Sequence, residues 1–342
     1  MSDTALTDTP AAPETAGGRP PLVAQLSDWQ RRFPLLQIVA LVALYGYGLA
    51  TIDGFGSHRV LYAILINASL LGLAGAGQTI VVLVGGIDFS IAAFISAGDV
   101  VIAELCGTYH WSVPAAAAVA LAVGAAGGLV NGLLSFRFRV EPLIVTLGVS
   151  ALVSGLLLKW INGAATGVTP AWLGDLTAAN GSTFGIAIPP VVLIWALVAL
   201  VIGLVLTRTR AGRNLYLTGV NQQAARLSLV RVGRTWICAY VASAVLAVCV
   251  GILLAGYSGS GNVTVGDPYL FQSLAAVIVG GTMFGGRGDY WRTVLGALVL
   301  SVVALLLSAA QLPSAEQQMV TGGLILAVVG LYGRERRLRD RI

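Results

Sequence analysis

The sequence predicts an all-α, polytopic membrane protein, and its composition, its hydrophobic runs and the distribution of its charges each indicate that class. Of the 342 residues, 57% are hydrophobic and only 10% are charged, and the mean hydropathy is +0.86. A water-soluble protein of this length needs more polar side chains to cover its surface. The 43 glycines agree with this class, because small residues allow membrane helices to pack closely.

Hydrophobic runs divide the chain into about ten helices, since a membrane-spanning helix needs about 20 mostly apolar residues. The predicted spans are 34–52, 60–84, 89–107, 114–134, 143–161, 189–207, 236–257, 270–285, 292–310 and 316–332. An even number of spans places both termini on one side of the membrane. With both termini in the cytoplasm, only Arg59 and Lys159 of the 20 Lys and Arg residues fall outside. That asymmetry follows the positive-inside rule, so the basic charge reflects topology and does not indicate nucleic-acid binding.

The parts of the chain beyond the spans are predicted to be cytoplasmic tails. Residues 1–29 are rich in Ala, Pro and Thr, and they lack both an apolar core and a basic start. They therefore predict a disordered tail and no signal peptide. Residues 333–342 form a short basic tail. The transmembrane domain is expected at 34–332.

The chain lacks the residues that an enzyme or a metal site would need. A nucleotide-hydrolysing loop of the Walker A type requires a lysine, and the only lysine, Lys159, lies at an outer helix end. His58 and His110 are in outer loops, and the three cysteines have unrelated spacing. We therefore expect no catalytic residue, no metal and no cofactor on this chain, with any ATP hydrolysis on a partner that binds ATP and Mg.

Residues 207–235 form a long polar segment on the predicted cytoplasmic side. Within it, Asn221 is a typical N-cap for a short helix that extends to Leu229. Ala224, Ala225 and Ser228 would give this helix a face of small residues, and Leu227 an apolar contact. The segment is interpreted either as a contact with another protein or as a connector whose arginines are anchored to lipid headgroups.

Two stretches, VLVGGIDFS at 82–90 and VIVGGTMFG at 277–285, repeat one pattern. It aligns Gly85 with Gly280 and Gly86 with Gly281, and glycine permits a broken or closely packed helix end. Asp88 occurs only in the first copy. Together with Ser90, it is expected to cap the next helix, or to pair with a basic residue and set an inward gate.

Asp99 lies about ten residues into the third predicted helix, which would bring it near the membrane midplane. It is expected to line a translocation path or to be a buried aspartate that is hydrogen-bonded to a neighbouring helix. Asp88, Asp99 and Glu104 also leave open an ion-coupled secondary transporter, and a channel is a third hypothesis. The predicted gate or path residues are Gly85, Gly86, Asp88, Ser90, Asp99, Gly280 and Gly281.

Three motifs, GGIDFS at 85–90, GVNQQAARLSLV at 219–230 and GDPYLFQSLAAVIVGGTMFGGRG at 266–288, resemble the permease subunits of bacterial ABC importers of the ribose, xylose and arabinose type. The resemblance covers roughly residues 34–335. It implies an inner-membrane permease that pairs with a second copy and docks a cytoplasmic ATPase. It also implies that a periplasmic binding protein delivers a monosaccharide or related small polar solute. The residues that match the family's ATPase-coupling region are Gly219, Asn221, Ala224, Ala225, Arg226, Leu227 and Ser228.

Overall fold

The computed structural model describes residues 34–178, 181, 183, 188–285, 288–313, 315–323 and 326. Over these residues the protein is a bundle of helices without any β-strand, and an isolated antiparallel bridge pairs Val168 with Ser260. The all-α class is therefore confirmed. The predicted tails at 1–29 and 333–342 lie outside the described residues, so they stay predictions.

The helices follow the hydrophobic runs closely, and most ends lie within a few residues of the predicted ones. A π-helical turn, Glu104–Thr108, extends α4, and residues 315–323 are also helical. The named helices are α2 (Leu35–Thr51), α3 (His58–Val84), α4 (Ile91–Ala103), α5 (Val113–Arg137), α6 (Pro142–Trp160), α7 (Ala171–Asp175), α8 (Pro190–Arg208), α9 (Arg210–Val220), α10 (Gln222–Leu227), α11 (Val232–Ser258), α12 (Asp267–Val279) and α13 (Tyr290–Ala309).

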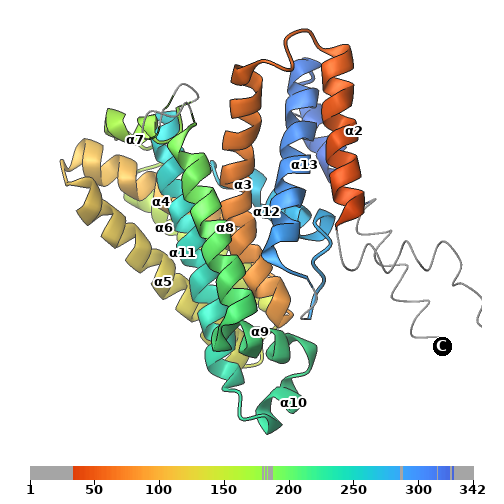
Figure 1. Ribbon diagram of the computed structural model, residues 1–342. Helices are drawn as coiled ribbons and strands as arrows, with labels where there is room; N and C mark the ends of the chain where they lie inside the picture. The colour runs from red at the N-terminus through yellow and green to blue at the C-terminus, as the bar shows by residue number, and fades with distance from the viewer. Residues whose placement is uncertain are drawn as a thin grey trace, which may run out of the picture.

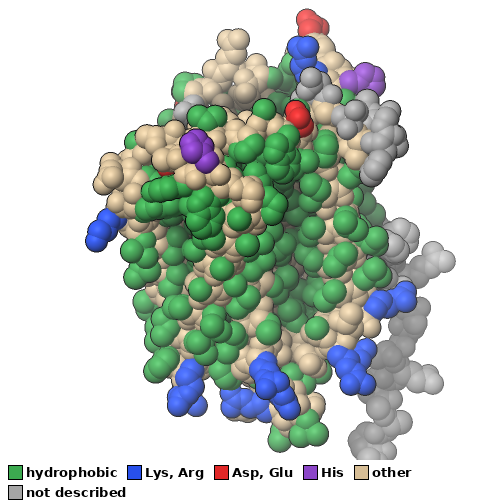
Figure 2. All heavy atoms as spheres, turned by 90° about the vertical axis from the view of Figure 1, so that its left-hand side faces the viewer, with side chains coloured by type: hydrophobic (Ala, Val, Ile, Leu, Met, Phe, Trp, Pro, Cys, Tyr) green, Lys and Arg blue, Asp and Glu red, His purple; other side chains and the backbone are tan. Residues whose placement is uncertain are grey.

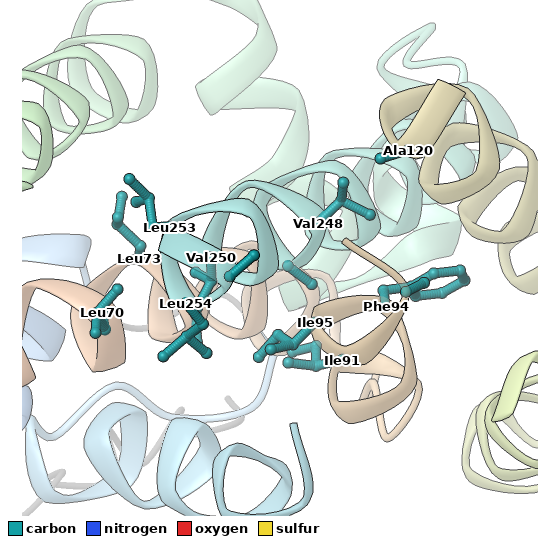
Figure 3. Packing of buried hydrophobic residues seen from close by; sticks show 14 of the residues in the cluster. Leu70, Leu73, Ile91, Phe94, Ile95, Ala120, Val248, Val250, Leu253 and Leu254 are labelled. Carbon is teal, nitrogen blue, oxygen red and sulfur yellow. The ribbon is translucent and has the colours of Figure 1, made fainter. Parts of the chain in front are cut away.

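Helix α11 is the centre of the bundle, because it packs against α3, α4 and α5 (Figure 1). Figure 3 shows this packing: Val248 and Leu254 of α11 lie among Leu70 of α3, Ile95 of α4 and Ala120 of α5. On the other side of α3, helices α13 and α2 follow in turn. Short α7 lies at one end of the bundle, and α9 and α10 lie at the other.

Paired glycines bring α4 and α11 into close contact. A Cβ atom on Gly98 of α4 would collide with the backbone of Val248, and a Cβ atom on Gly251 of α11 would collide with the backbone between Ile95 and Asp99. Each helix therefore supplies one glycine that faces the other helix's backbone. This close approach is typical of membrane helices, where small residues let dispersion forces act over a large contact.

Seven of the described helices are long and apolar enough to cross a membrane, namely α3, α4 with its π-helical turn, α5, α6, α8, α11 and α13. This confirms a multi-pass membrane protein, but the expected count of ten is not confirmed. The first predicted span corresponds to α2, which has 17 residues, and the predicted span at 270–285 corresponds to α12, which has 13. The last predicted span, 316–332, is described only in part.

Charged side chains lie mainly at the ends of the bundle. Figure 2 shows arginine side chains gathered at the lower end, where α10 lies in Figure 1, and hydrophobic side chains over the flank between the two ends. Arginines at the end of α5, the end of α8, in α9 and α10 and at the start of α11 account for this grouping. The distribution agrees with the cytoplasmic side that the positive-inside rule assigns to these loops.

The chain before α12 runs along α4 without helical structure, so α12 begins only at Asp267. A Cβ atom on Gly261 would touch Ala103 and Val100 near the end of α4, whereas one on Gly266 would collide with the backbone of Ala92 near its start. Residues 259–266 therefore run alongside α4 over about 16 Å, from its C-terminal toward its N-terminal end. Non-helical backbone at this depth is tolerated where protein or a water-filled cavity covers it.

Candidate functional site

The two glycine pairs end α3 and α12 with the same turn. Gly85 has φ 94° and Gly281 has φ 87°, a left-handed conformation that glycine adopts without steric penalty. The N–H groups of Gly85 and Gly86 donate to the carbonyls of Val82 and Val81, at 3.0 Å each. Gly281 and Thr282 donate to Ile278 and Val277, at 2.8 and 3.1 Å. Both helices therefore end in a Schellman motif.

The structural match between the repeats differs by one residue from the match that the sequence predicts. In the pair after α3 the first glycine, Gly85, is left-handed. In the pair after α12 it is the second glycine, Gly281, whereas Gly280 keeps helical angles. The other glycine of each pair serves packing, because a Cβ atom would collide with the Tyr240 hydroxyl at Gly86 and with the Arg292 carbonyl at Gly280. The residues that match in the sequence therefore have different backbone conformations in the structure.

The turn after α12 joins the turn after α3 to helix α9. The N–H of Gly285 donates to the carbonyl oxygen of Val82 at 3.2 Å, and a Cβ atom on Gly285 would lie 3.1 Å from the carbonyl oxygen of Gly219. The Tyr216 hydroxyl donates to the carbonyl of Gly288 at 2.8 Å. Burial, and then the charge of nearby Asp289, raises the pKa of Tyr216 to about 12, so its hydroxyl keeps the proton that it donates.

Asp88 lies in a buried hydrogen-bond network. Its Oδ1 atom accepts from the N–H of Ser90 at 2.9 Å and from the Ser90 hydroxyl at 2.5 Å. The same hydroxyl accepts from Nδ2 of Asn131 on α5 at 2.7 Å. The two neighbours of Asp88 are also hydrogen-bonded. Phe89 donates its N–H to the Thr146 hydroxyl on α6, and the carbonyl of Ile87 accepts from the Tyr240 hydroxyl on α11. The segment between α3 and α4 is thus bound to three helices.

The position of Asp88 supports neither the capping nor the ion-pair interpretation, because Ser90 is the N-cap of α4 and no side chain makes a capping hydrogen bond at that end of the helix. Asp88 is fully buried, and its bond to the N–H two residues ahead is an Asx turn that leads into α4. Burial raises the pKa of Asp88, while the hydrogen bonds from Ser90 lower it. Among the described residues the one salt bridge joins Arg292 to Asp289. The gate role expected for Asp88 therefore has no basic partner within the described part of this chain.

Replacing Asp88 with alanine is expected to lower the stability of the purified protein. The N–H and hydroxyl of Ser90 would lose their buried acceptor, which typically costs about 1–3 kcal/mol. Asp88→Asn keeps one acceptor oxygen and should lose much less. The thermal unfolding midpoint in detergent micelles measures both variants. Equal midpoints for Asp88→Ala and the unsubstituted protein would contradict this role.

Asp99 and Glu104 bind the backbones of segments that pack against α4. Oδ2 of Asp99 accepts from the N–H of Asn262 at 2.5 Å, so its partner is the non-helical segment 259–266 and not a neighbouring helix. Glu104 accepts from the Thr108 hydroxyl at 2.7 Å and from the N–H groups of Thr166 and Gly167 at 2.5 and 3.0 Å. Both carboxylates therefore hold segments outside the regular helices in place.

Helix α10 begins at the expected N-cap, but the side chains that it exposes are not the expected ones. Oδ1 of Asn221 accepts from the N–H groups of Gln223 and Ala224, at 2.9 and 3.0 Å, so the predicted N-cap is confirmed. Ala225, however, is only 1% exposed and packs against this chain, whereas Leu227 is 87% exposed. A contact between Ala225 and another protein is therefore excluded in this conformation, because the side chain faces inward.

A cavity of about 670 Å³ lies beside α10 and is lined in part by the turn after α3, at Gly85 and Gly86. Its wall comes from the turn after α3, the end of α5 with the α5–α6 corner, α10, the start of α11 and Phe284. The structure therefore brings Gly85 and Gly86 to the same cavity as Arg226 of the predicted coupling segment. Asp88, Asp99, Gly280 and Gly281 are not among its lining residues.

Several residues around these sites were not predicted from the sequence. Asn131 could have been found, because an amide inside an otherwise apolar membrane helix indicates a hydrogen bond to another segment. Thr146 carries a weaker signal, because its hydroxyl also bonds to its own helix at Pro142. Arg139 and Trp236 line the cavity, but no spacing rule connects them with α10.

A bundle of apolar, membrane-crossing helices with buried non-helical backbone and a short helix at its arginine-rich end defines a multi-pass membrane transport protein. Comparison with protein families gives the more specific assignment. The model described as "Branched-chain amino acid transport system / permease component" matches residues 60–329. The chain belongs to this family of permeases, which are the transport components and not the enzymes of ABC importers.

Curated relatives resemble most of the chain. The ribose import permease protein of Escherichia coli is 31% identical over 307 residues, which cover 90% of this chain and 94% of the relative. The autoinducer 2 import system permease protein of Enterobacter sp. is 30% identical over 311 residues, 90% and 88% of the two chains. The fructose import permease protein of Rhizobium meliloti is 32% identical over 275 residues, which cover 78% of this chain and 76% of the relative. No solved structure matches the chain.

Proposed function

We propose that this chain is the permease of an ATP-driven importer in a bacterial inner membrane, and that it passes a monosaccharide or a related small polar solute into the cytoplasm. The names of the relatives support the solute class, since they include import permeases for ribose, fructose and allose. The structural feature that carries the proposal is α10, a capped helix at the arginine-rich end of the bundle whose Leu227 is exposed. An exposed apolar side chain there suits contact with a cytoplasmic ATPase.

The proposed assembly contains a second permease copy, an ATPase that carries ATP and Mg, and a periplasmic binding protein. Within the coupling segment, Gly219, Asn221, Ala224, Arg226, Leu227 and Ser228 are proposed to present or position α10 for the ATPase. Ala225 is proposed to hold α10 on the permease, because it is buried.

The translocation path is proposed to follow α4 and the start of α12. Gly266, the N-cap of α12, packs on Ala92 near the start of α4. Both helices therefore direct their N-terminal ends, with their partial positive charge, to the same part of the bundle. The rings of Phe89 and Phe271 lie 5.9 Å apart there, and Phe271 is 57% exposed. Asp88, Ser90 and Asp99 are proposed to fix the shape of this path, together with Gly85, Gly86, Gly280 and Gly281.

Reconstitution into liposomes tests the proposal. Vesicles that contain the permease, the ATPase and the binding protein should accumulate radiolabelled sugar only when ATP is supplied to the ATPase. Vesicles with the permease alone should show no uptake under a proton or sodium gradient. Gradient-driven uptake by the permease alone would replace this proposal with secondary transport, and passive sugar flux would indicate a channel.

A further inference from the structure

The cavity beside α10 contains buried polar atoms without a hydrogen-bond partner. Trp236 and Ser135 both line the cavity, and each is only 7% exposed. The Nε1–H group of Trp236 donates no hydrogen bond, and the Ser135 hydroxyl neither donates nor accepts one, among the described residues. Buried polar groups are almost always hydrogen-bonded, so two such groups at one cavity indicate that a polar molecule binds there.

The other polar side chains of the cavity offer donors and acceptors together. Arg139 and Arg226 can only donate, Glu141 can only accept when ionised, and Gln222 and Gln223 do both. A phosphate group would be favoured by the arginines but repelled by the carboxylate. A sugar hydroxyl donates and accepts, so it matches the whole set. The chemistry therefore favours a neutral, polyhydroxylated molecule over an anion.

Aromatic rings and a strained backbone further shape the cavity. Phe136, Trp236 and Phe284 contribute rings to its wall, and such rings present apolar faces to the C–H groups of a sugar. The guanidinium of Arg226 lies over the Phe136 ring, 5.9 Å from its centroid. Arg139 has φ 56°, a left-handed conformation that is unfavourable for a residue with a side chain and occurs often at functional sites.

We propose that this cavity is a release site that binds the transported solute as a neutral, polyhydroxylated molecule before it enters the cytoplasm. Trp236 donates a hydrogen bond to the solute, Ser135 bonds to a second hydroxyl, and the side chains of α10 close the cytoplasmic side. This proposal rests on the proposed function. Since α10 is both a wall of the cavity and the proposed ATPase contact, solute binding and ATPase docking are linked, and each changes the affinity of the other.

The test measures sugar binding to the purified full-length permease in lipid nanodiscs. Saturation-transfer NMR would give dissociation constants for D-ribose, D-fructose and D-allose, and for ribose 5-phosphate and inorganic phosphate as anionic probes. Trp236→Phe removes the N–H and keeps an aromatic ring, and Ser135→Ala removes the hydroxyl. The matched control is Trp172→Phe, because Trp172 is exposed on α7 at the opposite end of the bundle.

At least one neutral sugar should bind to the unsubstituted protein. Loss of one hydrogen bond should weaken that binding roughly fivefold to tenfold in each cavity variant, and the control should stay within about twofold of the unsubstituted protein. The elution profile in size-exclusion chromatography checks that each variant is folded.

Three results would overturn the release site: no binding of any of the three sugars, unchanged binding in both cavity variants, or tighter binding of either anionic probe. The last result would reassign the cavity to a phosphate-bearing ligand. These outcomes are separate from the proposed function, because ATP-driven sugar uptake in reconstituted vesicles would stand without a sugar site at this cavity. Absence of such uptake for any sugar would refute the importer instead.

Discussion

Replacing Leu227 with aspartate should abolish solute-stimulated ATP hydrolysis by the assembled transporter while leaving the permease intact. The side chain is 87% exposed on α10, so a charge there meets water in the free permease and does not disturb its core. In the proposed complex the same carboxylate would be buried at the centre of a contact. Losing a central contact of this kind costs about 2 kcal/mol or more, which is roughly 30-fold in the dissociation constant.

Co-purification of the ATPase with tagged permease, together with ATP turnover, measures this effect. Leu227→Met is the matched control, because it keeps the apolar surface and should retain both activities. Ala225→Arg should behave differently: Ala225 is buried, so its replacement should lower permease abundance and stability. Normal ATPase docking by Leu227→Asp would favour the alternative in which the segment is a connector anchored to lipid headgroups.

Replacing Gly251 with leucine should prevent the protein from folding normally. A Cβ atom there collides with the backbone of α4 between Ile95 and Asp99, and backbone cannot move aside as a flexible side chain does. Overpacking typically costs about 1–3 kcal/mol and more at a helix crossing that cannot separate. Because α11 also packs against α3 and α5, displacement of this helix would disturb the whole core.

The amount of protein extracted from membranes and its thermal unfolding midpoint in detergent provide the measurements. Gly155→Leu on α6 is the control, since an added Cβ meets no atom within 4 Å. Gly98→Leu should reproduce the defect from the other side of the contact, where the backbone of Val248 blocks a side chain. If Gly251→Leu matched the control in both measurements, the close α4–α11 contact would be wrong.

The helices could be predicted because each long apolar run can satisfy its backbone inside a membrane only as a helix. The run predicted at 114–134 became α5, Val113–Arg137, and the one at 189–207 became α8, Pro190–Arg208. The expected span at 270–285 was too long, because Gly281 turns the chain. Hydropathy does not register that turn, since glycine is compatible with either conformation.

The candidate site was less predictable, because it depends on contacts between distant segments. The N-cap Asn221 acts on neighbours two and three residues away, and local rules were sufficient to predict it. By contrast, the inward direction of Ala225 depends on how α10 lies on the bundle. The cavity likewise combines Gly85, Arg139 and Trp236, and no local pattern indicates that these residues meet.

The non-helical segment 259–266 and the short α12 that follows it have a consequence for how the protein enters the membrane. At 13 residues, α12 spans only about 20 Å, well below the thickness of a bilayer's hydrocarbon core. The translocon would therefore not retain it as an independent stop-transfer segment. We expect α12 to move into place only after α4 and α11 have been inserted, since Asp99 and Ser96 of α4 bind Asn262 and Gly266. Biogenesis of this permease would then end with a folding step inside the lipid, later than the insertion of its long helices.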